Sequence, residues 1–89
     1  MKIFKLSVDL NNGSSHYADI PAGATFLTIQ LQLGVPCIWF LCDPDVPIAR
    51  RRIDVYGTGH ELPPNPGKYI DTVQFVNEGI VLHFFEVDQ

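Results

Sequence analysis

Basic residues gather in one short segment of this chain, and their chemistry suits an anion or a polar partner. Three of the six Lys and Arg residues form the run Arg50–Arg52, which leads through alternating residues to a Gly-Thr-Gly-His corner. Alternation along a strand puts Arg50, Arg52 and Tyr56 on one face, and arginine offers planar, bidentate donors to phosphate or carboxylate. We therefore predict a ligand- or partner-binding segment made of Arg50, Arg52, Tyr56, Gly57, Thr58, Gly59 and His60.

Each part of this segment also has a structural interpretation. The Gly57–Gly59 corner is either a turn or bulge that needs positive φ or a nest of backbone N–H groups that binds an anion. It lacks the third glycine and the helix of a nucleotide fingerprint. If the arginine run binds no ligand or partner, it is a solvated edge strand whose charge prevents aggregation. Arg51 points inward, and either lies at the frayed start of the strand or pairs with an acid such as Asp43, Asp45 or Asp71.

Catalytic and metal-binding patterns are weak in this chain. Neither the Cys-x-x-Cys nor the His-x-x-x-His spacing of a zinc site occurs. Thr58 lies two residues from His60, a pairing that is common by chance, and Asp43 and Asp45 lie in a proline-rich turn where acids are usual. We expect no enzyme, no metal and no cofactor. The candidate metal ligands are His16, His60, His83, Cys37 and Cys42, and we expect single histidines with ordinary hydrogen bonds and buried free thiols.

Composition indicates one small globular domain over residues 1–89. Hydrophobic residues make up 46% of the chain and charged residues only 18%, and this low charge content favours a homo-oligomer. The net charge of −4 argues against binding to duplex nucleic acid, whose partners usually carry a basic surface. Apolar runs are too short for a secretion signal or a membrane span, so we expect a soluble, cytoplasmic protein.

Alternating side chains predict a fold built from strands. Residues 37–42 are apolar on both faces, which is typical of a central strand, and Gly34-Val35 is the expected hairpin turn before it. Trp39 and Phe40 should face opposite ways. No helix of ten residues is visible, and the fold class is an all-β, antiparallel sandwich or partly open barrel of six to seven short strands. The other expected strands are residues 4–8, 16–20, 27–33, 50–56, 69–75 and 80–87.

Several short motifs resemble those of a family of small uncharacterised bacteriophage and prophage proteins. They cover most of the chain from Ile20 onward, and the most specific is Tyr-Gly-Thr-Gly-His at Tyr56–His60. The chain departs from that family at Asp71, where a glycine is common. The other matching motifs are Ile20–Ala24, Gln30–Gln32, Pro36–Trp39, Asp43–Asp45, Thr72–Gln74 and His83–Glu86.

The resemblance implies a cellular context and carries over no catalytic residue. It implies a small accessory protein made inside an infected or lysogenic bacterium. In that context we expect a non-enzymatic binding protein that counters host defence by inhibiting a host protein. One alternative is an oligomer that sequesters a nucleotide-derived immune signal, for which the partner is a small phosphate-bearing ligand held in a pocket. Another alternative is a structural or virion-associated assembly protein.

Overall fold

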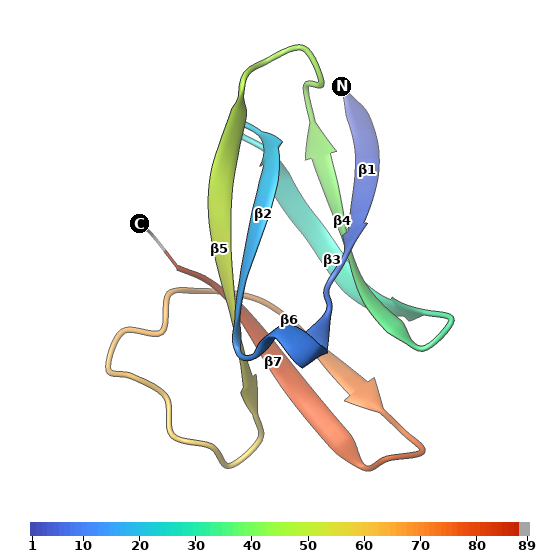
Figure 1. Ribbon diagram of the computed structural model, residues 1–89, viewed down its shortest axis with the longest axis vertical. Coiled ribbons are helices and arrows are strands. Elements are labelled where there is room, and N and C mark those ends of the chain that lie inside the picture. The colour runs from blue at the N-terminus through green and yellow to red at the C-terminus, as the bar shows by residue number, and fades with distance from the viewer. Residues whose placement is uncertain (88–89) are drawn as a thin grey trace.

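Two antiparallel sheets make up the part of the chain that the computed structural model describes, residues 1–87 (Figure 1). One sheet has three strands in the order β1-β4-β3, and the other has four in the order β2-β5-β7-β6. The predicted all-β sandwich is confirmed, and the sheets do not close into a barrel. The elements are β1 (Lys2–Ser7), the 3-10 turn η1 (Leu10–Asn12), β2 (Ser15–Pro21), β3 (Thr25–Gln32), β4 (Val35–Cys42), β5 (Ile48–Gly57), β6 (Lys68–Phe75) and β7 (Ile80–Val87).

The core lies between the two sheets and follows from the period of two along each strand. Ile38 and Phe40 of β4 point inward and pack with Ile53 of β5 and Phe84 of β7, all of them buried. Each inward residue alternates with one that faces out, because successive side chains of a strand point to opposite faces. As expected, β4 is the central strand of its sheet. Within residues 1–87, no helix is long and apolar enough to cross a membrane.

The hairpin between β3 and β4 turns one residue earlier than the sequence predicts. Gln32 pairs with Val35, so Leu33 and Gly34 form the turn, and the expected Gly34-Val35 turn is wrong. Both turn residues have positive φ, 52° for Leu33 and 79° for Gly34. A two-residue turn of this kind matches the twist of the strands that it joins. The twist therefore forces Leu33 into a conformation that leucine rarely adopts.

Asp71 joins the two sheets where the edges of β3 and β6 come together. Its Oδ2 accepts hydrogen bonds from Thr28 Oγ1 at 3.0 Å and from the Ile29 backbone N–H at 2.9 Å. Its Oδ1 accepts from the Thr72 backbone N–H at 2.8 Å. Burial alone raises the pKa of Asp71, but these three donors outweigh it and hold the pKa below its ordinary value. Asp71 thus satisfies edge N–H groups that the open sandwich leaves without a strand partner.

Candidate functional site

Of the predicted binding residues, Arg50, Arg52 and Tyr56 lie on the outer face of the four-stranded sheet, whereas residues 57–60 form the corner at the end of β5. Strand pairing puts Tyr56 opposite His83, and His83 opposite Thr72. The same pairing aligns Tyr17 with Arg52 and Asp19 with Arg50. We call this surface the polar–aromatic face. It consists of Ser15, Tyr17, Asp19, Arg50, Arg52, Asp54, Tyr56, Tyr69, Thr72, His83 and Phe85.

Both predicted arginines already have carboxylate partners on this face. Arg52 binds Asp54 through two hydrogen bonds of 3.0 and 2.9 Å, and Ser15 Oγ donates to the same carboxylate at 2.8 Å. Arg50 Nε donates to Asp19 Oδ1 at 3.1 Å, and its guanidinium carbon lies 5.6 Å from the centre of the Tyr17 ring. The face is therefore close to neutral, and its arginines are held in fixed orientations. A free ligand phosphate would have to compete with these carboxylates.

The position of the arginine run differs from the edge-strand interpretation. β5 lies between β2 and β7, so it is an interior strand of its sheet. The hydrogen bond to Asp19, and then its charge, hold the pKa of Arg50 above the ordinary value, and Asp54 does the same for the pKa of Arg52. The arginines are ordered by acids on and beside their own strand, and edge protection does not explain them.

Aromatic rings form a row across three strands of the face. The Tyr56 and Phe85 rings meet edge to face at 5.9 Å, and the Phe85 and Tyr69 rings meet in the same way at 5.7 Å. Burial, followed by the nearby charge of Asp54, raises the pKa of Tyr56. The phenol therefore stays protonated and available as a hydrogen-bond donor at neutral pH. Such rings combine apolar area with polar tips, as is typical of binding surfaces.

A chain of hydrogen bonds runs beside the aromatic row. Thr58 Oγ1 lies 2.7 Å from His83 Nε2, and His83 Nδ1 lies 3.0 Å from Thr72 Oγ1. Thr72 Oγ1 also lies 2.7 Å from the Tyr69 hydroxyl. Both ring nitrogens of His83 thus have partners, as expected for a half-buried histidine. These hydrogen bonds hold Thr58, which the sequence assigned to the binding segment, against the sheet.

The glycine corner is a tight turn whose amide groups donate to carbonyls of the protein itself. The His60 N–H donates to the Gly57 carbonyl at 3.1 Å, and the Thr58 N–H donates to the Val81 carbonyl at 3.2 Å. Gly59 has a φ of 86°, which favours glycine. A Cβ on Gly57 would lie 2.8 Å from His60 Cε1, so the imidazole packs directly on the glycine backbone. These two amides are occupied within the protein, and the turn interpretation of the corner has the stronger geometric support.

A shallow hollow lies beside this corner. It has a volume of about 510 Å³. Gly57, Thr58 and His60 supply its polar edge, and Ile80, Val81 and Leu82 supply most of its apolar surface. A hollow of this size accommodates a small ligand, and it lies outside the polar–aromatic face, since none of its lining residues belongs to that face.

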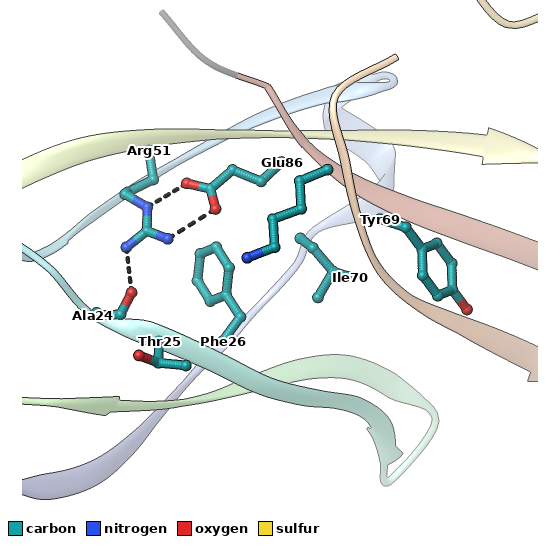
Figure 2. Close-up of a pocket in the computed structure, with 8 residues that line it drawn as sticks. Ala24, Thr25, Phe26, Arg51, Tyr69, Ile70 and Glu86 are labelled. Carbon is teal, nitrogen blue, oxygen red and sulfur yellow. Dashed lines mark hydrogen bonds and ion pairs between the residues drawn. The ribbon is translucent and has the colours of Figure 1, made fainter. Parts of the chain in front are cut away.

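A second polar site lies between the sheets and was missed by the sequence analysis (Figure 2). Arg51 donates through Nε and Nη2 to the Glu86 carboxylate, and through Nη1 to the Ala24 carbonyl at 2.7 Å. Its guanidinium carbon lies 4.4 Å from the centre of the Phe26 ring. The predicted pairing of Arg51 with Asp43, Asp45 or Asp71, or its fraying, is wrong. Antiparallel pairing of β5 with β7 brings Glu86 to Arg51 from 35 residues away.

This second site is a small pocket in which Arg51 is bound by Glu86 and the Ala24 carbonyl, and which Lys68 also lines. Its volume is about 170 Å³. In Figure 2, the Tyr69 ring lies apart from the arginine–glutamate pair. No three or more His, Cys, Asp or Glu side chains within residues 1–87 are placed to hold a metal ion. The Arg51 contacts in this pocket thus hold the two sheets together. The polar–aromatic face is the better binding candidate.

Comparison with protein families places the whole chain in a family without an assigned function. The model of the Domain of unknown function (DUF7352) family matches residues 1–89. The chain belongs to this family. Searches of curated proteins and of solved structures each found no match. Membership of DUF7352 supports the expected resemblance to an uncharacterised family, and the function has to be argued from the surface of the molecule.

Sequence analysis assigned three of the eleven residues of the polar–aromatic face to the binding segment. It identified Arg50, Arg52 and Tyr56, which alternate along one strand. It missed the residues that neighbouring strands contribute, because their place depends on strand pairing. Alternation within β2, β6 and β7 marks these side chains as outward-facing, but only the register brings them beside the arginines. The residues from neighbouring strands that it did not place there are Ser15, Tyr17, Asp19, Tyr69, Thr72, His83 and Phe85.

Proposed function

We propose that this protein is a non-enzymatic, phage-type accessory protein that counters host defence by binding and inhibiting a host protein. The polar–aromatic face is the binding surface, and the protein acts in the bacterial cytoplasm. The observation that carries the proposal is the row formed by Tyr56, Phe85 and Tyr69 beside two pre-oriented arginines. Tyrosine and arginine are enriched among the residues that dominate the binding energy of protein interfaces.

The charge of the face favours a protein partner over a free phosphate. Arg50 and Arg52 are matched by Asp19 and Asp54, so little positive charge remains for an anion. A protein partner gains from the same arrangement, because ordered side chains lose little entropy on binding. Shape points the same way, since a sheet face is broad and suits a partner surface better than a small molecule.

Capture from bacterial lysate, followed by affinity measurement with the purified partner, tests the proposal. We expect Tyr17→Ala and Tyr69→Ala each to weaken binding at least tenfold, and about thirtyfold where the tyrosine is a main anchor. Both rings are exposed, 56% for Tyr17 and 54% for Tyr69, so their removal should not disrupt the core. The activity of the captured protein is then titrated with wild-type protein.

Val76→Ala is the matched control for these truncations. Val76 is 83% exposed and lies in the turn between β6 and β7, off the polar–aromatic face. The control should bind as the wild type does. A partner that binds both tyrosine variants at wild-type affinity would place the interface elsewhere. A partner whose activity is unchanged at saturation would remove inhibition from the proposal.

Sequestration of a nucleotide-derived signal is the second candidate, and the hollow beside Thr58 and His60 favours it. In that case native mass spectrometry of protein isolated from infected cells should show a bound small molecule that denaturation releases. His60→Ala should abolish its retention, whereas Tyr17→Ala should leave it unchanged. A ligand-free mass would favour a protein partner. Nothing on the surface specifically favours a virion-associated assembly role.

A further inference from the structure

The outer face of the three-stranded sheet differs in chemistry from the rest of the molecule. Strand pairing aligns Ile3 with Leu41 and Lys5 with Trp39, and these side chains point away from the core. Ile3 is 59% exposed. We call this surface the neutral face. It consists of Ile3, Lys5, Ser7, Thr25, Thr28, Gln30, Gln32, Val35, Cys37, Trp39 and Leu41.

Charge is almost absent from the neutral face. The chain has ten acidic residues, and none of them lies in β1, β3 or β4. Lys5 is the one basic residue on the face, and its Nζ donates to Gln32 Oε1. These two side chains cross β4 above Cys37, which explains why that outward thiol is buried. The carboxylate of Asp71 lies at the β3 edge of the face, where Thr28, Ile29 and Thr72 already donate to it. A partner can therefore cover the rest of the face without removing a carboxylate from water.

The hairpin at the end of this sheet carries a leucine that is unfavourable in two respects. Leu33 is 100% exposed, and its φ of 52° is one that asparagine or glycine adopts far more readily. In Figure 1 the turn between β3 and β4 projects away from the other loops. Residues that break local rules of this kind are expected where they make a contact outside the chain.

A hollow adjoins this leucine on the same end of the sheet. It is open, with a volume of about 750 Å³, and has Leu33 at its rim. A leucine side chain fits easily into such a space, and the mixed apolar and amide surface offers it contacts. The other residues that form the hollow are Lys5, Leu6, Ser7, Gln32, Val35 and Cys37.

We propose that the neutral face binds a second copy of this chain, so that the protein forms a two-fold symmetric dimer. Leu33 of each copy occupies the hollow of the other, because a two-fold axis makes each contact reciprocal. The charge distribution selects this occupant. Two chains of net charge −4 repel each other, and the neutral face is where they approach without opposing acids. Homodimer interfaces are likewise poor in charge at their centre.

The size of the face sets the expected strength of the dimer. Three strands of six to eight residues present a projected area of roughly 350 Å². Side-chain relief and the hairpin enlarge the accessible area that is buried, but the interface stays at the low end of specific ones. The dimer should therefore be weak, and it should be visible as a rise in mass with concentration.

This inference goes beyond the proposed function, because it concerns the opposite sheet. The dimer leaves the polar–aromatic face of each copy exposed. If the dimer does not form, partner binding through Tyr17 and Tyr69 is still expected. If no partner binds that face, the dimer is still expected.

Sedimentation velocity and light scattering over a concentration series test the dimer with the full chain. Wild-type protein should approach twice the monomer mass as its concentration rises. Leu33→Asp should remain a monomer at every concentration, since a carboxylate loses its hydration in the partner's hollow and the one cation there, Lys5, is already bound to Gln32. The substitution suits the positive φ of this turn, so the thermal midpoint of the variant should equal or exceed that of the wild type.

Val76→Asp is the matched control, because it adds the same charge at an exposed turn of the other sheet. It should dimerise as the wild type does. Three results would overturn the proposal: a wild type that stays monomeric at the highest concentration, a Leu33→Asp variant that still dimerises, or equal weakening by both substitutions. The last result would mean that net charge, and not the neutral face, controls association.

Discussion

Individual residues in this protein are constrained most strongly where the backbones of two segments lie in direct contact. Gly67 is the clearest case. Its φ is 102°, and a Cβ at this position would lie 2.2 Å from the Glu86 carbonyl oxygen. Backbone atoms cannot move aside as a flexible side chain can. Close approach of the loop to β7 therefore requires glycine here for two independent reasons.

Gly67→Ala should lower the free energy of unfolding by about 2–5 kcal/mol, the sum of backbone strain and overpacking. Chemical denaturation followed by circular dichroism measures the change. Gly79→Ala is the control, since Gly79 also has a positive φ, of 66°, but nothing lies within 4 Å of its added Cβ. It should cost only about 1–2 kcal/mol. Equal losses in both variants would contradict the close contact at Gly67.

Asp71 links the two sheets through charge-assisted hydrogen bonds, and its role depends on pH. Its pKa in the folded protein lies below the ordinary value, so the unfolded chain binds the proton more tightly. The stabilisation is therefore present above about pH 4 and is lost as the pH falls through the folded-state pKa.

Asp71→Asn should lower the stability at pH 7 by about 1–3 kcal/mol, because an amide cannot accept from all three donors. The difference between variant and wild type should shrink as the pH falls from 4 to 2, as measured by urea denaturation. Asp45→Asn, in the loop between β4 and β5, leaves the bridge intact and should change stability by less than about 0.5 kcal/mol. A difference that stays constant down to pH 2 would exclude the charged bridge.

At the scale of elements, a second set of polar contacts joins the two sheets, and the pattern of the sequence does not reveal it. Arg51 of β5 binds Glu86 of β7 and also the Ala24 carbonyl, which precedes β3. It thereby connects the four-stranded sheet to the start of a strand in the other sheet. Both charged side chains are only 19% exposed, and loss of one partner leaves the other charge poorly solvated.

A double-mutant cycle measures this connection. Arg51→Met and Glu86→Leu should each lower the free energy of unfolding by about 2–4 kcal/mol, because each leaves one mostly buried charge without its partner. The double variant should recover part of this loss, which gives a coupling energy of about 1–3 kcal/mol. Chemical denaturation of the four proteins provides the values. Additive losses would show that the two charges act independently.

On the scale of the whole molecule, chemistry is divided between two outer faces. The four-stranded sheet carries the polar–aromatic face with its paired charges, and the three-stranded sheet carries the neutral face. The molecule is thin, with extents of 40 × 32 × 20 Å, so both faces lie close to the same core. A dimer through the neutral face would present two copies of the polar–aromatic face, and a dimeric target would then be bound with increased avidity.

Local sequence determined the strands and most of the turns, but not every inward residue. Alternation within residues 27–33 predicts that Leu27 and Leu33 share a face with the buried Ile29, whereas a bulge between Phe26 and Thr28 leaves Leu27 48% exposed and the turn leaves Leu33 fully exposed. Alternation predicted that Ile53 and Val55 face the core and that Trp39 and Phe40 point oppositely, and the structure confirms both, because the period of two is a property of the strand itself. Turn chemistry predicted the hairpins but misplaced one by a residue, since the strand twist selected Leu33.

Tertiary structure alone decided which outward residues become neighbours. Arg50 meets Asp19 from 31 residues away, and Tyr56 joins a row with Phe85 and Tyr69. Such pairs depend on strand order and register, which arise from burial of the whole core and not from any local pattern. For the same reason the sequence identified three outward residues of β5, Arg50, Arg52 and Tyr56, while only the folded sheet assembled the surface around them.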